Sequence, residues 1–342
     1  MYELQRLMGS IRLMGAEARV QPWFRTDLLL YSPCPVKLAV KESLDAIAAA
    51  RAERGAEEVV IHIPMGCTSI DPFDPIYMEK NPDKLPSIIA SIGFGDFWKK
   101  EFADRFVGAG LFEAVLPARI NPLHEEAGMI DPEGRYTIYG STPYIFMVDE
   151  NLLGGLPIPR AWEDVLHPRY KGRVVMCGDG DDMADAVLLN IFKAHGEEGV
   201  RRLAENSRSL MHSSVMAMVA GSSDPNAGAI YIIPAFFAES GKRPAHVRVV
   251  WPDDGAAASP LYFLAKKSEK DRLADVTGFF TEGFAKMDSA AWFTPIGRTD
   301  NSSLPANAKL KWVGWDFIKD NDINKLRDGL NASFRTMQKE LW

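Results

Sequence analysis

Short apolar runs alternate with amphipathic segments along most of this chain, and this alternation constrains the fold more than any other feature. Residues 28–31 read as a strand, residues 36–47 place apolar side chains on one helical face, and residues 59–63 read as the next strand. Pro35 and Gly55 mark the two ends of that helix. A strand, a helix and a strand in this order predict two parallel strands joined by a crossover helix. The expected fold class is therefore α/β.

A second block of strands and helices starts near residue 157. Residues 174–176 read as a strand, and the following apolar residues recur with helical spacing until Gly196, which is placed to end that helix. Residues 259–264 form a strand that leads back to the first block. A chain of 342 residues suggests about two domains. We expect one discontinuous α/β lobe from residues 1–148 plus 264–342, and a second α/β lobe from residues 149–263.

The net charge and the first residues bear on location and partners. A net charge of −7 offers no basic face to phosphate, so nucleic acid is not an expected partner. No stretch approaches the roughly 20 apolar residues of a membrane span, so no membrane insertion is expected. Residues 1–20 lack the continuous apolar core of a signal peptide. We expect a cytoplasmic location, with a periplasmic or extracytoplasmic one as the alternative if a leader was removed.

Three cysteines follow three of the strand-like runs. Cys34, Cys67 and Cys177 each come after an apolar run, and their spacing does not resemble a disulfide framework. In open α/β sheets, ligands bind beyond the carboxyl ends of the strands, so the three thiols could meet in one cleft. Three thiolates could hold a soft metal or an iron–sulfur cluster with one open coordination position. The alternatives are a thiol-lined site without metal, or cysteines that pack as small apolar residues.

The common catalytic signatures are missing from the sequence. It contains no GxSxG, GxxxxGK[ST] or HExxH motif, and no GxGxxG follows a strand. The Gly-Asp-rich residues 178–182 resemble a calcium loop but lack its final glutamate, so helix capping is the favoured role. His212 precedes an apolar helical segment in a loop-like position, and we place it near the ligand. The residues favour a binding protein over an enzyme.

Residues 159–174, PRAWEDVLHPRYKGRV, resemble a segment of the solute-binding proteins of ABC importers. In the iron(III)-type branch of that family, the pattern P-x-x-W-x-D-L-x-x-P-x-Y-x-G-x-V opens the second lobe. Residues 144–151 resemble the first crossover strand of the family, and residues 250–255 resemble the stretch before the return crossover. The resemblance implies a type 2 periplasmic-binding-protein-like fold, with two lobes joined by crossover hinge strands and a ligand between them.

The resemblance also implies which residues line the cleft. Paired tyrosines, often used for iron(III) in that branch, are not evident here, because Tyr231 stands alone. The chain therefore resembles a divergent, cysteine-containing subgroup, and Cys34, Cys67 and Cys177 are the expected metal ligands. The expected ligand-binding residues are Cys34, Lys37, Cys67, Thr68, Ser69, Asp71, Ser141, Thr142, Cys177, Asp179, His212, Ser213, Tyr231 and Asp254.

Three hypotheses follow from the sequence. The first is a solute-binding protein that holds a thiolate-coordinated metal or iron–sulfur species between its lobes. The second is an ordinary ABC-importer receptor for a small solute without metal, with an ABC permease as its partner. The third is a cluster-dependent enzyme on the same fold, since one fold can host many functions.

Overall fold

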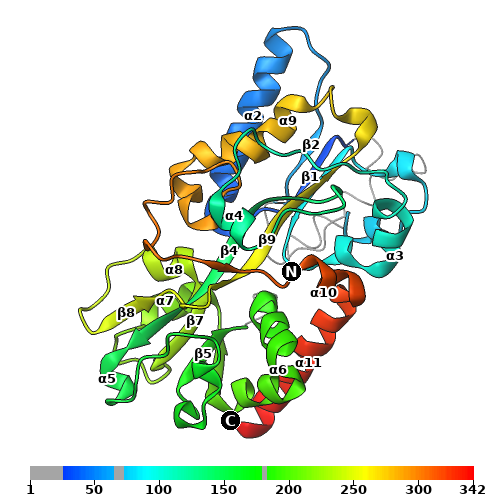
Figure 1. Cartoon of the computed structure of the whole chain (residues 1–342). Coiled ribbons are helices and arrows are strands. Elements are labelled where there is room, and N and C mark those ends of the chain that lie inside the picture. The colour runs from blue at the N-terminus through cyan, green and yellow to red at the C-terminus, as the bar shows by residue number, and fades with distance from the viewer. Residues whose placement is uncertain (1–25, 65–72, 179–182) are drawn as a thin grey trace, which may run out of the picture.

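The computed structural model describes residues 26–64, 73–178 and 183–342, and one mixed β-sheet runs through both halves of the molecule (Figure 1). The strand order is β2-β1-β3-β9-β4-β7-β5-β6, with β10 beside β9 and β8 beside β4. The strands are β1 (Leu28–Leu30), β2 (Ile61–His62), β3 (Ile88–Ile92), β4 (Thr137–Asp149), β5 (Val174–Cys177), β6 (Ser207–Met211), β7 (Ile230–Pro234), β8 (Val247–Val250), β9 (Ala256–Ala265) and β10 (Leu310–Lys311).

Helices cover both faces of this sheet (Figure 1). They are α2 (Lys37–Glu53), α3 (Lys100–Phe102), α4 (Pro122–Glu126), α5 (Glu150–Leu153), α6 (Asp185–Asn206), α7 (Ser213–Val219), α8 (Ala235–Glu239), α9 (Ala274–Gly278), α10 (Trp315–Asp320) and α11 (Ile323–Leu341). Within the described residues, no helix is both long and apolar enough to cross a membrane.

The first half of the sheet is the predicted crossover unit. β1 pairs in parallel with β2 on one side and with β3 on the other, and α2 connects β1 to β2. This arrangement confirms the predicted parallel pair. β2 is only two residues long, shorter than the predicted run at residues 59–63.

The second half repeats the same topology. β5 pairs in parallel with β6 and with β7, and α6 connects β5 to β6. Gly196, the predicted end of this helix, instead lies at a kink inside α6 with a φ of 63°, a conformation that favours glycine. The β1–α2–β2–β3 and β5–α6–β6–β7 units thus place their first strands in equivalent positions, although the sequence shows no repeat.

Two long antiparallel strands, β4 and β9, join the halves. The first part of β4 pairs with β9, and its last part pairs with β7 and β8. Each of the two strands is buried at every position except one, Thr142 in β4 and Ser259 in β9, and these two residues are cross-strand partners. The crossover strand predicted from residue 144 therefore begins seven residues earlier, at Thr137.

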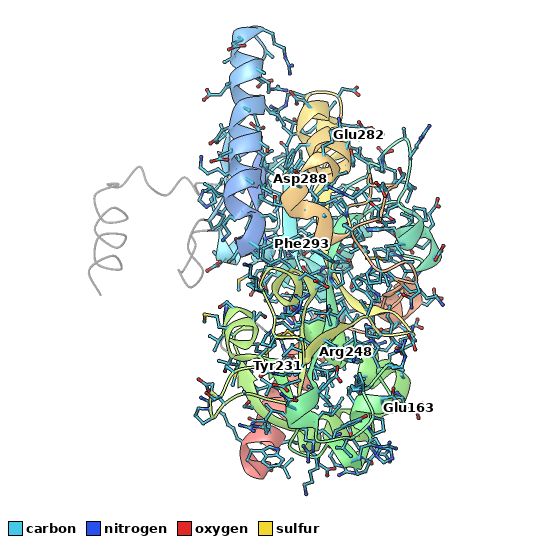
Figure 2. All side chains as sticks on the ribbon, turned by 90° about the vertical axis from the view of Figure 1, so that its left-hand side faces the viewer. Glu163, Tyr231, Arg248, Glu282, Asp288 and Phe293 are labelled. Atoms are coloured by element: carbon cyan, nitrogen blue, oxygen red, sulfur yellow. The ribbon has the colours of Figure 1, made fainter. Side chains whose placement is uncertain are left out.

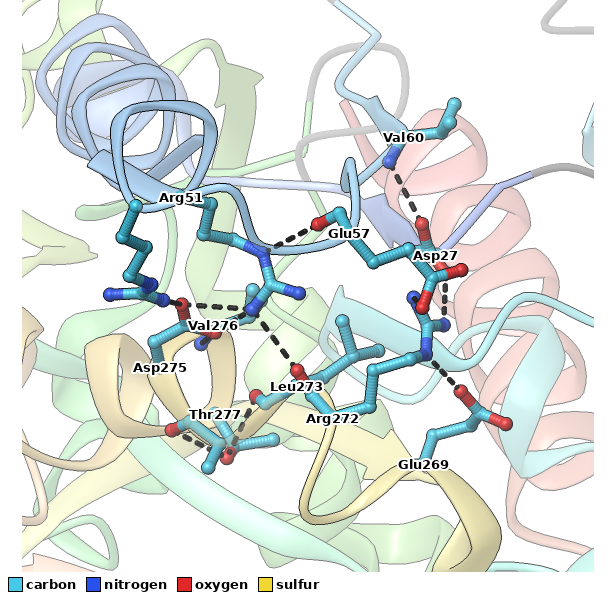
Figure 3. A network of polar contacts seen from close by, with 12 residues as sticks. Asp27, Arg51, Glu57, Val60, Glu269, Arg272, Leu273, Asp275, Val276 and Thr277 are labelled. Atoms are coloured by element: carbon cyan, nitrogen blue, oxygen red, sulfur yellow. Dashed lines mark hydrogen bonds and ion pairs between the residues drawn. The ribbon is translucent and has the colours of Figure 1, made fainter. Parts of the chain in front are cut away.

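An ion-pair network ties the outer end of the first half together (Figure 3). Arg51, whose side chain is only 5% exposed, donates to Asp275 at 2.8 and 2.9 Å. Asp27, which precedes β1, binds Arg272 and accepts a hydrogen bond from the Val60 backbone nitrogen at 2.9 Å. The network fixes α2 and the start of β1 to the segment around α9.

The C-terminal helix α11 packs along α6, so it lies beside the second half of the sheet (Figure 1). Asn331 donates to the Asp185 carboxylate at 2.8 Å, and Gln338 donates to the Arg208 carbonyl at 3.0 Å. At its other end, Asn324 donates to the carbonyls of Phe94 and Gly95 in the first half, at 3.0 and 3.1 Å. α11 therefore contacts both halves, although the predicted division assigns it to the first lobe.

Candidate functional site

The two described cysteines lie near the ends of β1 and β5 and differ in exposure. Cys34 begins the turn after β1 and is exposed, whereas Cys177 is the last residue of β5 and is fully buried in the core. The backbone beyond Cys177 is tightly covered, since a Cβ atom at Gly178 would lie 2.9 Å from the Met183 sulfur. Cys67, the third predicted thiol, lies outside the described residues, as do Thr68, Ser69, Asp71 and Asp179.

The predicted three-thiolate metal or iron–sulfur site is not supported. Across residues 26–64, 73–178 and 183–342, no group of three or more His, Cys, Asp or Glu side chains is placed to hold a metal ion. Cys177 packs as a small apolar residue, the alternative role that sequence reasoning left open. A strand-end position predicts where a residue sits, but not whether its side chain faces the site.

Two neighbouring candidates, Ser141 and Thr142, face opposite sides of the β4–β9 ribbon. Because side chains alternate along a strand, Thr142 points to the same side as its partner Ser259. On this side a Cβ atom at Gly93, at the end of β3, would lie 3.7 Å from the Ser259 hydroxyl. Thr142, Ser259 and the end of β3 therefore form one partly exposed surface where the halves join.

Ser141 is fully buried and belongs to a polar cluster behind the ribbon. Its hydroxyl lies 2.7 Å from the Thr294 hydroxyl, and the Thr294 carbonyl lies 2.6 Å from His124 Nε2. Burial lowers the pKa of His124 to about 4, although the hydrogen bond to Thr294 acts in the opposite direction, so this imidazole is neutral at pH 7. Thr294 has a φ of 40°, unusual for a β-branched residue.

An aromatic contact joins the two halves on the same side as Thr294. Phe236 of α8 stacks on Phe293 with ring centroids 5.7 Å apart. In Figure 2, Phe293 lies in the upper half of the molecule and Tyr231 in the lower half. The buried cluster around Ser141 thus lies on the face of the ribbon opposite to Thr142 and Ser259, and the Phe236–Phe293 contact links the two halves.

His212 and Ser213 are at the start of α7, the helix that follows β6. His212 is exposed, and its Nδ1 accepts from the Ser214 backbone nitrogen at 3.2 Å and lies 2.8 Å from the Ser214 hydroxyl. Nδ1 is thus used in capping, while the rest of the ring lies near Phe237, with centroids 6.5 Å apart. Ser213 is fully buried. In the other half, Lys37 is partly exposed at the start of α2.

Tyr231 and Asp254 have structural partners. The fully buried Tyr231 hydroxyl accepts from the Gly228 backbone nitrogen at 2.7 Å, and burial raises the pKa of this phenol to about 12. Asp254 binds Lys311 at 2.6 Å and the Trp162 backbone nitrogen at 3.2 Å. A ligand role for either residue stays a prediction.

Two hydroxyl-bearing residues were not among the predicted candidates. Ser32, which follows Tyr31 after the end of β1, is 5% exposed, and its hydroxyl has no hydrogen-bond partner among the described residues. Ser259 is the cross-strand partner of Thr142. Ser32 could have been found by its position after the first strand-like run, but the pairing of Ser259 depends on strand register.

A family model described as "Bacterial extracellular solute-binding protein" matches residues 83–321. This match contradicts the cytoplasmic location predicted from the sequence, which is therefore wrong. That prediction depended on the first residues and on cysteine usage, and neither determines where a protein works. No curated protein sequence matches the chain.

Solved structures share the fold at low sequence identity. An ABC transporter protein from Clostridium perfringens is 16% identical, with a TM-score of 0.59, over 87% of this chain and 97% of that chain. The apo ferric ion-binding protein A of Pasteurella haemolytica is 11% identical, with a TM-score of 0.58, over 92% and 97%. Trichodesmium IdiA (FutA), in complex with iron and citrate, is 10% identical, with a TM-score of 0.58, over 86% and 95%. These likenesses confirm the predicted type 2 periplasmic-binding-protein-like fold.

Proposed function

This chain belongs to the bacterial extracellular solute-binding proteins, and on that premise we propose that it captures a small solute between two lobes and delivers it to an ABC permease. The family consists of receptors, which agrees with the predicted absence of enzymatic activity. The divergent cysteine-containing subgroup has no support from the described cysteines, because Cys177 is buried in the core.

The observation that carries the proposal is the paired exposure of Thr142 and Ser259. All other residues of β4 and β9 are buried, so these two hydroxyl-bearing side chains mark the place where the crossover strands accept a ligand. Solute-binding sites are concave and present a few polar groups that fix the orientation of the ligand. We propose that the lobes hinge about this pair and close on the solute.

The lobe boundaries remain a proposal, with one amendment. We keep residues 1–148 and 149–263 in separate lobes, and residues 264–314 with the first. The hydrogen bonds of Asn331 and Gln338 to residues of the second half favour moving α11 to the second lobe. In this division Asn324 would connect the lobes beside the hinge.

The described candidates favour an organic solute over a bare metal ion. Thr142 and Ser259 carry no charge, Lys37 adds a positive charge, and Asp254, the carboxylate among the described candidates, is paired with Lys311 at 2.6 Å. Hard cations such as Fe³⁺ require carboxylate or phenolate oxygens, and the Tyr231 phenol is buried and hydrogen-bonded. We propose a small solute with hydrogen-bonding groups, neutral or negatively charged.

Iron carried as an organic chelate is the second candidate. It is favoured by the fold shared with the Trichodesmium protein, whose structure contains iron and citrate. In a chelate, the organic ligand supplies the hard oxygen donors, and the protein needs only hydrogen-bond donors such as Thr142 and Ser259.

Calorimetry with ferric citrate, citrate alone and a panel of metal-free solutes tests both candidates. Ser259→Leu should abolish binding of the true solute because the larger side chain occupies the hinge surface, whereas Ser268→Leu, on an exposed turn, is the matched control. X-ray scattering should show compaction on binding. Solute binding that survives both Ser259→Leu and Thr142→Leu would refute the hinge site.

A further inference from the structure

A cavity that is lined by neither Thr142 nor Ser259 lies in the first half. It has a volume of about 400 Å³ and lies between α3, the π-helical turn Ala103–Val107, and α10. This volume falls within the range of about 300–1,000 Å³ found for small-molecule sites. None of the predicted ligand-binding residues lines it. π-helical turns are rare and are frequently found at functional sites.

Three aromatic side chains line the inner part of this cavity. Trp98 and Tyr136 are stacked, with ring centroids 4.2 Å apart and planes inclined by 2°. Trp315 of α10 lies 6.0 Å from each of them, at 37° and 35°. Trp98 and Tyr136 are almost fully buried, so their positions are fixed by packing. Such rigid aromatic walls suit a planar ligand, since offset and tilted ring contacts are favourable.

The carboxylates around the cavity already have partners. Asp131 accepts from the backbone nitrogens of three residues, Glu133, Arg135 and Tyr136, at 2.8–2.9 Å. Glu133 binds Lys319 at 2.7 Å, and this ion pair holds the pKa of Glu133 below its usual value. Asp104 forms an ion pair with Lys100 at 3.2 Å. Asp322 caps α11 by accepting a hydrogen bond from the Lys325 backbone nitrogen. Exposed Asp316 has no short contact within the described part of the chain.

The positive charges at the cavity are less well matched. The Arg135 guanidinium donates no hydrogen bond to any described residue, and its Nε is buried without a partner. Arg135 lines the cavity, and a Cβ atom at Gly110, which does not line it, would lie 3.4 Å from Arg135 Nη1. The buried Trp315 indole nitrogen also lacks a partner among these residues. Arg135 is partly exposed at the cavity, so an anion placed here would pair with the accessible part of its guanidinium.

We propose that this cavity binds a planar aromatic carboxylate, with the ring against Trp98, Tyr136 and Trp315 and the carboxylate on Arg135. An aromatic cation would find the same rings and the Asp316 carboxylate at the cavity, but it would also meet the Arg135 guanidinium, which makes no hydrogen bond to a described residue. Trp98, Arg135 and Tyr136, which supply two of the rings and the charge, all belong to the first half, so these contacts do not depend on closure of the lobes.

Calorimetry of the full chain with 2-naphthoate tests the proposal. We expect 2-naphthoate to bind, and 2-naphthamide and cyclohexanecarboxylate to bind at least about tenfold more weakly, because each lacks either the charge or the flat ring. Binding of 2-naphthylmethylamine in preference to 2-naphthoate would overturn the assignment of charge. Equal binding of all these compounds, or no binding of 2-naphthoate, would overturn the proposal.

Variants locate the bound probe. Arg135→Gln should weaken 2-naphthoate binding about tenfold or more, and Arg135→Lys should restore part of it. Ala103→Leu fills the cavity without changing a charge, so it should weaken binding even if Arg135→Gln fails to fold. Asp316→Asn should strengthen binding. Arg160→Gln, an exposed arginine of the other half, and Ser259→Leu at the hinge should leave it unchanged. Loss of binding in Ser259→Leu but not in Ala103→Leu would place the probe at the hinge and refute the proposal.

Discussion

Asp185 should destabilise the folded protein at neutral pH, and its replacement by asparagine should therefore stabilise it. Asp185 is the first residue of α6, and its side chain is 18% exposed. Burial raises its pKa from 3.8 to about 6, against the opposing effects of Arg327 at 3.8 Å and of the hydrogen bond from Asn331. Charged Asp328 also faces it and acts in the same direction as burial, whereas Arg335 opposes it.

The raised pKa sets the size and the pH range of the effect. A rise from 3.8 to about 6 corresponds to about 3 kcal/mol of lost stability when the carboxyl is charged. The N-terminal end of the helix dipole favours the charged form by about 0.3–1 kcal/mol, so we expect a net loss of about 2 kcal/mol. For an acid with a raised folded-state pKa, this loss is absent below about pH 4, develops between pH 4 and 6, and is complete above pH 6.

Thermal unfolding of Asp185→Asn and of the unchanged protein at pH 7 and pH 4 measures the effect. At pH 7 the variant should melt about 4 °C higher, since 1 kcal/mol shifts the melting temperature of a large domain by about 2 °C. At pH 4 the two proteins should melt within a degree or so of one another. A variant that is less stable at pH 7, or a difference that does not change with pH, would refute the reasoning.

Three further substitutions test the assigned contacts. Asp275→Asn should have the opposite pH dependence. Burial opposes the charged form of Asp275, but the hydrogen bonds from Arg51 and Arg54 outweigh it and lower the pKa of this carboxyl. In chemical unfolding, the variant should therefore lose about 2 kcal/mol of stability at pH 7 and less as the pH falls below 4. Cys177→Ser should cost about 1–3 kcal/mol of stability by placing a hydroxyl in the core, whereas exposed Cys34→Ser should change stability by less than about 0.5 kcal/mol. Neither variant should change the metal content of the protein. Loss of bound metal in either variant would support the thiolate site. Tyr231→Phe should cost about 1–3 kcal/mol of stability because the Gly228 backbone nitrogen loses its acceptor. Binding of the solute, measured by calorimetry, should be unchanged. Weaker binding at unchanged stability would assign Tyr231 to the site.

The local elements of the fold could be predicted from the sequence, because their signals are local. The crossover unit from β1 to β2 follows from apolar spacing and from helix-end residues. The start of β4 at Thr137 could not be predicted in this way. Gly140 and Pro143 read as loop residues, and the strand is held by antiparallel pairing with β9, more than a hundred residues away. Strand pairing at that separation has no local sequence signal.

The exposure of the candidate residues could not be predicted from the sequence. Cys177 is the last residue of β5, whereas Cys34 lies beyond the end of β1, at Leu30. Their exposure differs because Met183 and Leu210 cover the chain directly after Cys177, and those contacts depend on tertiary packing. The same limit applies to Ser141 and Thr142, which are adjacent in sequence but lie on opposite faces of one strand.

We therefore take Thr142 and Ser259 as a better guide to the ligand site than the thiols of Cys34 and Cys177. The sequence offers Cys34 and Cys177 as the more reactive groups, but a ligand can use a side chain only where packing leaves it accessible. Thr142 and Ser259 come from strands that both cross between the halves, and their side chains lie on one face. In the proposed hinge closure, a solute that contacts both would contact the two connections between the halves at once, which would link its binding to the angle between the lobes. A ligand held by Cys34 alone would touch only the first half and would have no direct way to favour closure.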